Sequence, residues 1–353
     1  MMLDKMHAEM PTAPLRLALD EDALIANWKS LDRLSGEACA GAAVKANAYG
    51  TGAIRVVPLL HAAGCRNFFV AHWSEAGDIL ALTEPGTVSV LHGPLTDADA
   101  AFARANAVKP VINSLAQARR WIECGGGLCD LMVDTGMNRL GVALDELGDP
   151  LLSRLDIDIL VSHLVASEED TPLNEVQRQR WCDAREVVRH RRASLANSGG
   201  IALGSAYHGD VTRPGLALYG GVPCDAMADH IRQVVRPQTA LLQVRTIHSG
   251  DTVGYNATFT ATRTMRVGTV ALGYADGYLR CWSGKGVLRD ADGTALPVLG
   301  RVSMDLSIVD LTLAPQLVEG DWLTVDFALP EASRISGLTQ YELLTTLGQR
   351  FVR

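Results

Sequence analysis

The stretch Ala40–Gly64, AGAAVKANAYGTGAIRVVPLLHAAG, sets a pattern that the chain repeats for much of its length. Its opening run, Ala40–Ala46, is small and apolar except for Lys45, and a glycine-containing turn follows, as expected of a short buried strand. Ala53–Ala63 then has apolar residues at helical spacing and ends at Gly64. The stretch therefore predicts one βα unit with a lysine at the carboxyl end of its strand.

Strand-like and helix-like runs alternate in this way as far as about residue 220, and about eight such units predict a (β/α)8 barrel. A doubly wound sheet is the alternative, but no G-x-G-x-x-G or P-loop motif supports it. The expected strands are Ala40–Ala46, Asn67–His72, Thr87–His92, Lys109–Asn113, Cys129–Asp134, Ile157–His163, Ala193–Asn197 and Leu216–Tyr219. The expected helices are Ala53–Ala63, Ser74–Leu82, Asp97–Ala107, Leu115–Cys124, Leu144–Leu155 and Asn174–Arg189.

The pattern changes after Pro237 to short β-rich runs separated by turns such as Gly250-Asp251. We therefore expect two domains, an α/β barrel over residues 15–232 and a mostly β domain over residues 233–353. Leu15–Leu19 is a lone strand outside the count of eight, which leaves it available to cross to the β domain.

Composition excludes several classes of protein. The 353-residue chain has a formal net charge of −8, which gives no support to nucleic-acid binding. Its seven cysteines include no C-x-x-C pair, so they indicate no metal site, and reduced thiols suit the cytoplasm. No apolar run reaches the roughly 18 residues of a membrane span, and Met1–Pro14 lacks the apolar core of a secretory signal. We expect a cytoplasmic protein that binds neither membrane nor nucleic acid.

Lys45 is the first candidate for chemistry, because barrels carry their active sites at the carboxyl ends of their strands. Partial burial would lower its pKa, and a neutral amine can form an imine with a carbonyl or with pyridoxal phosphate (PLP), or act as a base. A lysine that reaches water or pairs with a carboxylate is the alternative. The other polar residues at expected strand ends are Tyr49, His92, Asn113, Asp134 to Arg139, His163 and Ser167.

A phosphate site is predicted at the same rim. Asn197-Ser198 follows a strand and opens a possible helix, where a hydroxyl and free N–H groups suit a phosphate. Arg213-Pro214-Gly215-Leu216 adds a cation and an open backbone. The alternatives are an ordinary helix cap for Ser198 and a surface ion pair for Arg213.

Nine motifs in order along the chain, from about residue 15 to its end, make this sequence resemble the alanine racemases. That family consists of PLP enzymes with a barrel and a β domain, and the resemblance implies interconversion of L- and D-alanine. The motifs are Ala43–Gly50 (AVKANAYG), Asp134–Gly141 (DTGMNRLG), Ser162-His163, Asn197-Ser198, Arg213–Gly220 (RPGLALYG), Val253–Ala257 (VGYNA), Gly273–Tyr278 (GYADGY), Gly300–Asp305 (GRVSMD) and Tyr341-Glu342.

The resemblance implies that Lys45 carries PLP through an imine and that Arg213 meets the pyridine nitrogen. Because arginine keeps its proton, that nitrogen stays unprotonated and the ring is a weaker electron sink than one paired with aspartate. A weak sink suits an enzyme that returns the proton to the same carbon. The resemblance places these further residues around the cofactor: Tyr49, His163, Asn197, Ser198, Gly215, Leu216 and Tyr341.

Racemisation needs a proton acceptor and a proton donor on opposite faces of the α-carbon. The resemblance implies that Lys45 serves one face and that Tyr255, from the partner subunit of a homodimer, serves the other. A phenol needs help to act as a base at neutral pH, which His163 beside Arg213 would supply. An aromatic packed in the β domain is the alternative for Tyr255, and a core histidine is the alternative for His163.

The resemblance also implies a site for the substrate. Arg139 and the partner's Met304 N–H would meet the alanine carboxylate, the partner's Tyr274 would narrow the entrance, and Asp305 would order the Met304 loop. A loop ion pair, perhaps with Asp134, is the alternative for Arg139. Many members of the family have a carbamylated lysine seven residues before this arginine, whereas this chain has Met132, which carries no charge. Arg139 must therefore be oriented by another group.

Three other functions stay open on the sequence. One is an amino-acid racemase of broader specificity, or another PLP enzyme on the same scaffold, such as a decarboxylase. Another is a protein that carries PLP without turnover, and the last is a non-enzymatic barrel, which would show no cofactor at all. The complete β domain with its Tyr255 and Met304 motifs argues against the carrier.

Overall fold

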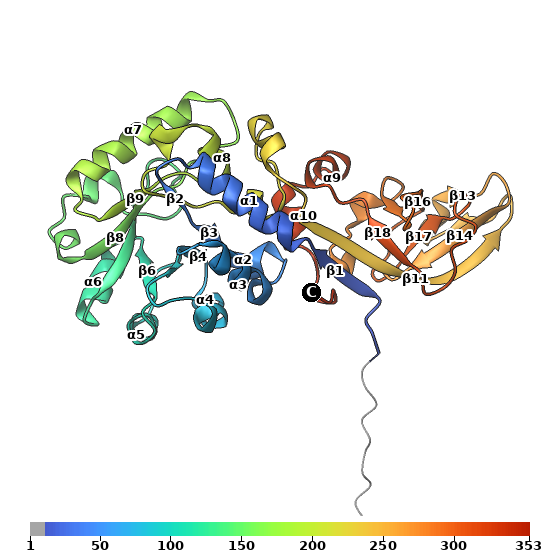
Figure 1. Ribbon diagram of the computed structural model, residues 1–353, viewed down its shortest axis with the longest axis horizontal. Coiled ribbons are helices and arrows are strands. Elements are labelled where there is room, and N and C mark those ends of the chain that lie inside the picture. Colours follow the sequence, from blue (N-terminus) through green and yellow to red (C-terminus); the bar gives the residue numbers. More distant parts are fainter. Residues whose placement is uncertain (1–10) are drawn as a thin grey trace, which may run out of the picture. The chain divides into compact units, whose positions relative to one another are not determined.

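The computed structural model describes residues 11–353, which form two compact units (Figure 1). One unit is Asp20–Val234, and the other contains strand β1 (Leu15–Leu19) together with Val235–Arg353. The expectation for Met1–Pro14 lies largely outside the described residues. Within residues 11–353, every helix falls short of the length and apolar character that crossing a membrane demands.

The Asp20–Val234 unit is a closed parallel barrel. Seven strands pair in the order β3 to β9, and β10 pairs with β2, which continues into β3 across Gly41. Arg213 N–H donates to the Ala196 carbonyl (2.8 Å) and Ala43 N–H to the Pro214 carbonyl (2.9 Å), which closes the ring through β10. The (β/α)8 prediction is confirmed. The strands are β2 (Cys39–Ala40), β3 (Ala42–Ala43), β4 (Phe68–Val70), β5 (Val88–Val90), β6 (Lys109–Ile112), β7 (Leu128–Met132), β8 (Asp156–Val161), β9 (Arg192–Ser194) and β10 (Val211–Thr212).

Helices lie on the outside of these strands, as Figure 1 shows for α4 to α7. Their apolar faces meet the sheet in a cluster that includes Trp121 of α6, Leu131 of β7 and Ala184 of α7. The helices of the unit are α1 (Glu21–Leu34), α2 (Lys45–Tyr49), α3 (Ala53–Ala63), α4 (Trp73–Ile79), α5 (Asp97–Ala105), α6 (Leu115–Glu123), α7 (Pro172–Val187) and α8 (Ser198–Ala202).

Two expected elements were wrong. Leu216–Tyr219 is a buried 3-10 turn, and the eighth strand is Val211–Thr212, a run too short to stand out in the sequence. Leu144–Leu155 forms two 3-10 turns, Leu144–Glu146 and Leu152–Arg154, because Gly148 and Pro150 interrupt any longer helix.

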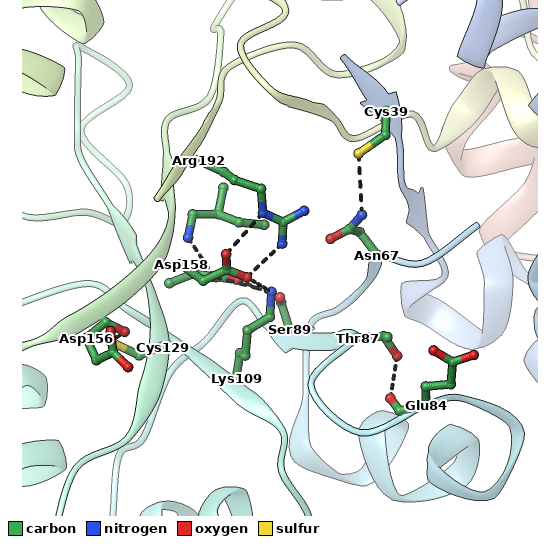
Figure 2. A network of polar contacts seen from close by, with 12 residues as sticks. Cys39, Asn67, Glu84, Thr87, Ser89, Lys109, Cys129, Asp156, Asp158 and Arg192 are labelled. Carbon is green, nitrogen blue, oxygen red and sulfur yellow. Dashed lines mark hydrogen bonds and ion pairs between the residues drawn. The ribbon is translucent and has the colours of Figure 1, made fainter. Parts of the chain in front are cut away.

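An ionic network lies inside the barrel among residues of strands β5 to β9 (Figure 2). The Lys109 ammonium, almost fully buried, lies 2.7 Å from an Asp158 oxygen and 3.5 Å from an Asp130 oxygen. Arg192 donates two hydrogen bonds to Asp158, at 3.0 and 2.7 Å, and Ser89 donates one to Asp130. The cations Lys109 and Arg192 hold the pKa of Asp158 down at about 2 despite its partial burial. Every charge in the network therefore has an oppositely charged partner.

The second unit is a closed antiparallel β-barrel. Its sheet runs β1-β11-β14-β17-β16-β15-β18, and β18 also pairs with β11. Leu15–Leu19 pairs with Val235–Thr239 of β11, so the first and last parts of the chain build one sheet. The remaining elements are β11 (Val235–Ile247), β12 (Thr252–Val253), β13 (Phe259–Thr260), β14 (Met265–Val270), β15 (Val287–Arg289), β16 (Ala295–Leu299), β17 (Ser307–Asp310), β18 (Trp322–Val325), α9 (Leu329–Ser336) and α10 (Gln340–Thr345).

Candidate functional site

Lys45 opens a left-handed turn rather than ending a strand. Strand β3 stops at Ala43, and Ala46, Asn47, Ala48 and Tyr49 all have φ of 53–54°. Left-handed backbone costs a residue with a side chain roughly 1–2 kcal/mol. Such strain persists only where the surroundings impose it, and it gathers at functional sites. Here the turn carries the chain from Lys45 to Tyr49.

Tyr49 lies against a glycine and a second tyrosine. A Cβ on Gly215 would overlap the Tyr49 hydroxyl, so only glycine allows this approach. The Tyr49 ring stacks on Tyr219 with centroids 4.9 Å apart, and the Tyr219 hydroxyl donates to the Ala43 carbonyl (2.9 Å). The end of β3 is thereby joined to the 3-10 turn Leu216–Tyr219 beside Lys45.

Ser198 and its neighbours form a cradle of hydrogen-bond donors. The Ser198 hydroxyl accepts from the N–H groups of Gly215 (3.0 Å) and Ala217 (3.2 Å), and Asn197 caps α8 by accepting from Gly200 N–H (2.9 Å). Among residues 11–353, the N–H groups of Ser198, Gly199 and Leu216 find no hydrogen-bond acceptor. This cluster is suited to an anion such as a phosphate.

Arg213 is buried, with its guanidinium fixed by the barrel strands. It donates to the Ser194 hydroxyl, to the Ser162 carbonyl (2.6 Å) and to the Leu195 carbonyl (3.4 Å). Burial lowers the pKa of Arg213 to about 10, so the group remains a cation at neutral pH. The alternative of a surface ion pair is therefore wrong.

The positive charges of this rim act on one another. Burial lowers the pKa of Lys45, and the charges of Arg139 and Arg213 lower it further, whereas Glu75 opposes them. Burial and the cations Arg213, Lys45 and Arg139 lower the pKa of His163 to about 3. His163 is thus a neutral imidazole that can accept or donate a hydrogen bond but carries no charge.

Arg139 is exposed, and within the described part of the chain its guanidinium has no ion-pair or hydrogen-bond partner. The Asp134 carboxylate instead accepts from the N–H groups of Gly136 and Met137, both at 2.8 Å. Met132 packs inside the barrel in an apolar cluster with residues such as Val161. Arg139 is therefore a cation available to an external carboxylate.

In the β unit, the expected substrate residues lie on two connected loops. Tyr274 N–H donates to the Ser303 carbonyl (3.0 Å), and a Cβ on Gly273 would overlap the Met304 carbonyl. Arg350 joins the loops, with ion pairs to Asp305 at 2.7 Å and to Asp276 at 2.6 Å. The Asp276 carboxylate in turn accepts from Gly273 N–H.

The side chains of Tyr255 and Met304 are 65% and 53% exposed on the β unit. Tyr255 begins a 3-10 turn after Gly254, and Gly254 lies close to the backbone of Arg301, on the segment that leads to Met304. Tyr341 lies in the first turn of α10 and is partly buried. An exposed phenol does not fit the alternative of a packed aromatic for Tyr255.

The sequence patterns of two domain families match this chain: "Alanine racemase, N-terminal domain" over residues 19–223 and "Alanine racemase, C-terminal domain" over residues 234–353. The chain belongs to the alanine racemase family. It is 40% identical to an alanine racemase of Rhizobium meliloti, over 98% of this chain and 97% of that protein.

Solved structures of alanine racemases agree. The enzyme of Bartonella henselae, solved with covalently bound pyridoxal phosphate, has a TM-score of 0.88 and 33% identity, over 97% of this chain and 99% of that one. The biosynthetic alanine racemase of Pseudomonas aeruginosa has a TM-score of 0.84 and 32% identity, over the same shares of the two chains.

In this alanine racemase family member, the structure adds three supporting residues that sequence reasoning did not assign. Tyr219 and Ser194 hold Tyr49 and Arg213, and Arg350 holds Asp305. Tyr219 lies inside the motif that begins at Arg213, so its position could have been noticed. Nothing in the sequence distinguishes Ser194 or Arg350, because each acts only through contacts between segments far apart in the chain.

Proposed function

We propose that this protein is a PLP-dependent alanine racemase that works as a homodimer with shared active sites. The observation that carries the proposal is the pairing, in one barrel rim, of the Lys45 amine, whose pKa is lowered by burial and by two arginines, with an anion cradle around Ser198. A cofactor that combines an aldehyde with a phosphate matches these two features.

The residues present fit PLP. Lys45 would hold the aldehyde carbon, and the Tyr49 and Ser198 hydroxyls, the open backbone at Gly215 with the free N–H of Leu216, and Tyr341 would hold the phosphate. Arg213 would face the pyridine nitrogen, with Asn197 and His163 beside the ring. When bound, PLP supplies an electron-withdrawing group that acidifies the α-hydrogen of the amino acid.

Two residues would then move the proton. The Lys45 amine, whose pKa burial and the cations Arg139 and Arg213 lower, would accept or donate it on one face of the α-carbon once the substrate amine has displaced Lys45. Tyr255 of the partner subunit does so on the other face. Neutral His163 can hydrogen-bond the phenolic oxygen of Tyr255. When Tyr255 is a phenolate, the cation Arg213 stabilises its negative charge.

Arg139 and the backbone N–H of the partner's Met304 would bind the substrate carboxylate, and the partner's Tyr274 would limit its side chain. Arg139 is exposed and has no ion-pair partner among residues 11–353, while Asp134 accepts from backbone N–H groups. Asp305 and Arg350 would keep the Met304 loop in place. All seven cysteines are free, which fits a cytoplasmic location.

Purified protein tests the proposal. We expect racemisation from either enantiomer of alanine, and the absorbance of lysine-bound PLP, which Lys45→Ala abolishes. Tyr255→Phe should lower the rate in both directions by about 10²- to 10⁴-fold. Full activity of Tyr255→Phe would place the second base elsewhere, and faster turnover of serine, lysine or arginine would show a broader racemase.

A further inference from the structure

Glu75, at the third position of helix α4, has a hydrogen-bonding pattern that reaches beyond its own helix. One carboxylate oxygen accepts from the N–H groups of Ala71 (2.8 Å) and His72 (3.1 Å), which is the usual task of a glutamate at this position. The other oxygen accepts from the N–H of Ala46, at 2.6 Å. Ala46 follows Lys45 directly in the chain.

The bond to Ala46 joins the ends of two neighbouring barrel strands. Strands β3 and β4 pair in parallel, and Ala46 and Ala71 follow them on the same side of the barrel. Ala46 is also the first of the four left-handed residues that lead to Tyr49. A carboxylate that accepts three N–H groups fixes the point at which this strained turn begins.

The charge of Glu75 also acts on Lys45. Burial, Arg139 and Arg213 lower the pKa of Lys45, and Glu75 is the carboxylate that raises it. The other titratable groups that interact with Lys45 are His92 and His163. His92 packs edge-on against His72, with ring centroids 4.3 Å apart, and Glu75 likewise favours the charged form of His92.

We propose that Glu75 is a positioning residue for Lys45, because its carboxylate ties Ala46 to the end of β4 and places a negative charge near the lysine amine. The proposal rests on the function proposed above for Lys45. On this proposal Glu75 acts through the backbone at Ala46 and through its charge.

The test compares three variants in the holoenzyme. Glu75→Gln keeps the size of the side chain but removes the charge and one accepting oxygen. Glu75→Asp keeps the charge on a side chain that is one methylene shorter. The matched control is Asp99→Asn, since Asp99 caps α5 by accepting from Leu95 and Thr96 N–H and, among residues 11–353, accepts from no strand-end N–H group.

Hydrogen exchange of residues 45–50 is the first measurement, and it is independent of turnover. We expect exchange at least tenfold faster in Glu75→Gln and Glu75→Asp than in the wild type, and unchanged in Asp99→Asn. PLP retained during dialysis should fall about tenfold in Glu75→Gln. Wild-type exchange in both Glu75 variants would overturn the positioning role.

The pH dependence of kcat is the second measurement, because it reports Lys45 when substrate is bound. Removing a nearby negative charge lowers the pKa of an amine, so the acid limb of kcat should move to lower pH in Glu75→Gln but stay in place in Glu75→Asp. If the acid limb of kcat lies at the same pH in Glu75→Gln and in the wild type, the charge of Glu75 does not act on Lys45. If the wild type neither binds PLP nor racemises alanine, the proposed function fails, while hydrogen exchange still decides whether Glu75 holds Ala46.

Discussion

The hydroxyl of Tyr49 occupies the space that a side chain at position 215 would need. The same glycine donates its N–H to Ser198, so one residue brings together the tyrosine and the helix that face the anion cradle. At this scale the site depends on close approach, and a single methyl group is enough to disturb it.

Gly215→Ala should therefore displace Tyr49 and weaken PLP binding by about tenfold or more, since the overlap cannot be relieved without moving the ring or the turn. Equilibrium dialysis of the cofactor measures this. Gly148→Ala is the matched control, because a Cβ at Gly148 meets open space. Equal PLP affinity in both variants would contradict the argument.

His163 should make the protein less stable in acid. Its pKa in the folded state, about 3, lies below the ordinary value of about 6.5. Above pH 6.5 both folded and unfolded states leave it neutral, whereas between pH 6.5 and 3 only the unfolded state binds the proton, and stability falls. His163→Asn should lose less stability between pH 7.5 and 5, measured by urea unfolding. His230→Asn, at an exposed site, controls for the loss of a histidine.

Sequence reasoning named residues that the structure brings together around the cradle, but it could not describe their contacts. Ser198, Arg213 and Tyr49 were found because polar groups at strand ends of a barrel share one rim. The contact between Tyr49 and Gly215 joins positions 166 residues apart by their numbers in the chain, and no local pattern signals it. The sequence likewise left open an ion pair between Asp134 and Arg139, whereas Asp134 bonds to the N–H groups of Gly136 and Met137.

At the scale of elements, the turn Ala46–Tyr49 departs most from local preference. Ala46 and Asn47 are exposed, so no packing of their own side chains explains the left-handed backbone. The hydrogen bonds at both ends explain it instead. Glu75 accepts from Ala46 N–H, and the Asn47 side chain accepts from Ala53 N–H (2.7 Å) at the start of α3.

Ala46→Gly should stabilise the protein by roughly 0.5–1 kcal/mol, because glycine adopts φ of +53° without a Cβ clash and keeps the N–H that bonds to Glu75. Ala101→Gly, at an exposed position within α5, should instead destabilise the protein by a similar amount. Urea unfolding of both variants gives the comparison. Destabilisation by Ala46→Gly as large as that by Ala101→Gly would mean that the turn is unstrained.

The sequence predicted the strands and helices well where periodicity was strong, and it failed where burial came without periodicity. Leu216–Tyr219 is apolar and wholly buried, and such a run can be a strand or a turn. In the structure it follows Gly215 as a 3-10 turn. The strand before Lys45 was expected to reach Ala46 and stops at Ala43. Four left-handed residues with side chains have no signature in a sequence.

At the scale of the whole molecule, the expected site residues divide between the two units. Lys45, Arg139 and Arg213 belong to the parallel barrel, whereas Tyr255 and Met304 belong to the β unit. The proposed homodimer requires each site to combine a barrel from one subunit with Tyr255 of the partner subunit. The family motifs predicted this division, but a single sequence contains no direct signal of a partner.

Mixing two inactive variants tests the shared site. Lys45→Ala and Tyr255→Phe should each be nearly inactive alone. In a mixed dimer, one site receives Lys45 from one chain and Tyr255 from the other, so random exchange of subunits should restore about a quarter of wild-type activity. Each variant exchanged with itself is the control. Mass spectrometry shows whether mixed dimers have formed. If they have formed and activity still does not recover, the two subunits do not share Lys45 and Tyr255 in one site.

The pairing of Leu15–Leu19 with β11 has a consequence for folding during synthesis on the ribosome. Strand β1 leaves the ribosome first, but its partner follows roughly 200 residues later, after the entire parallel barrel. At about 5–20 residues per second, β1 waits some 10–40 seconds with its backbone edge unpaired. Its alternating sequence LRLAL has only one charge, so nascent chains have an aggregation-prone end throughout that interval.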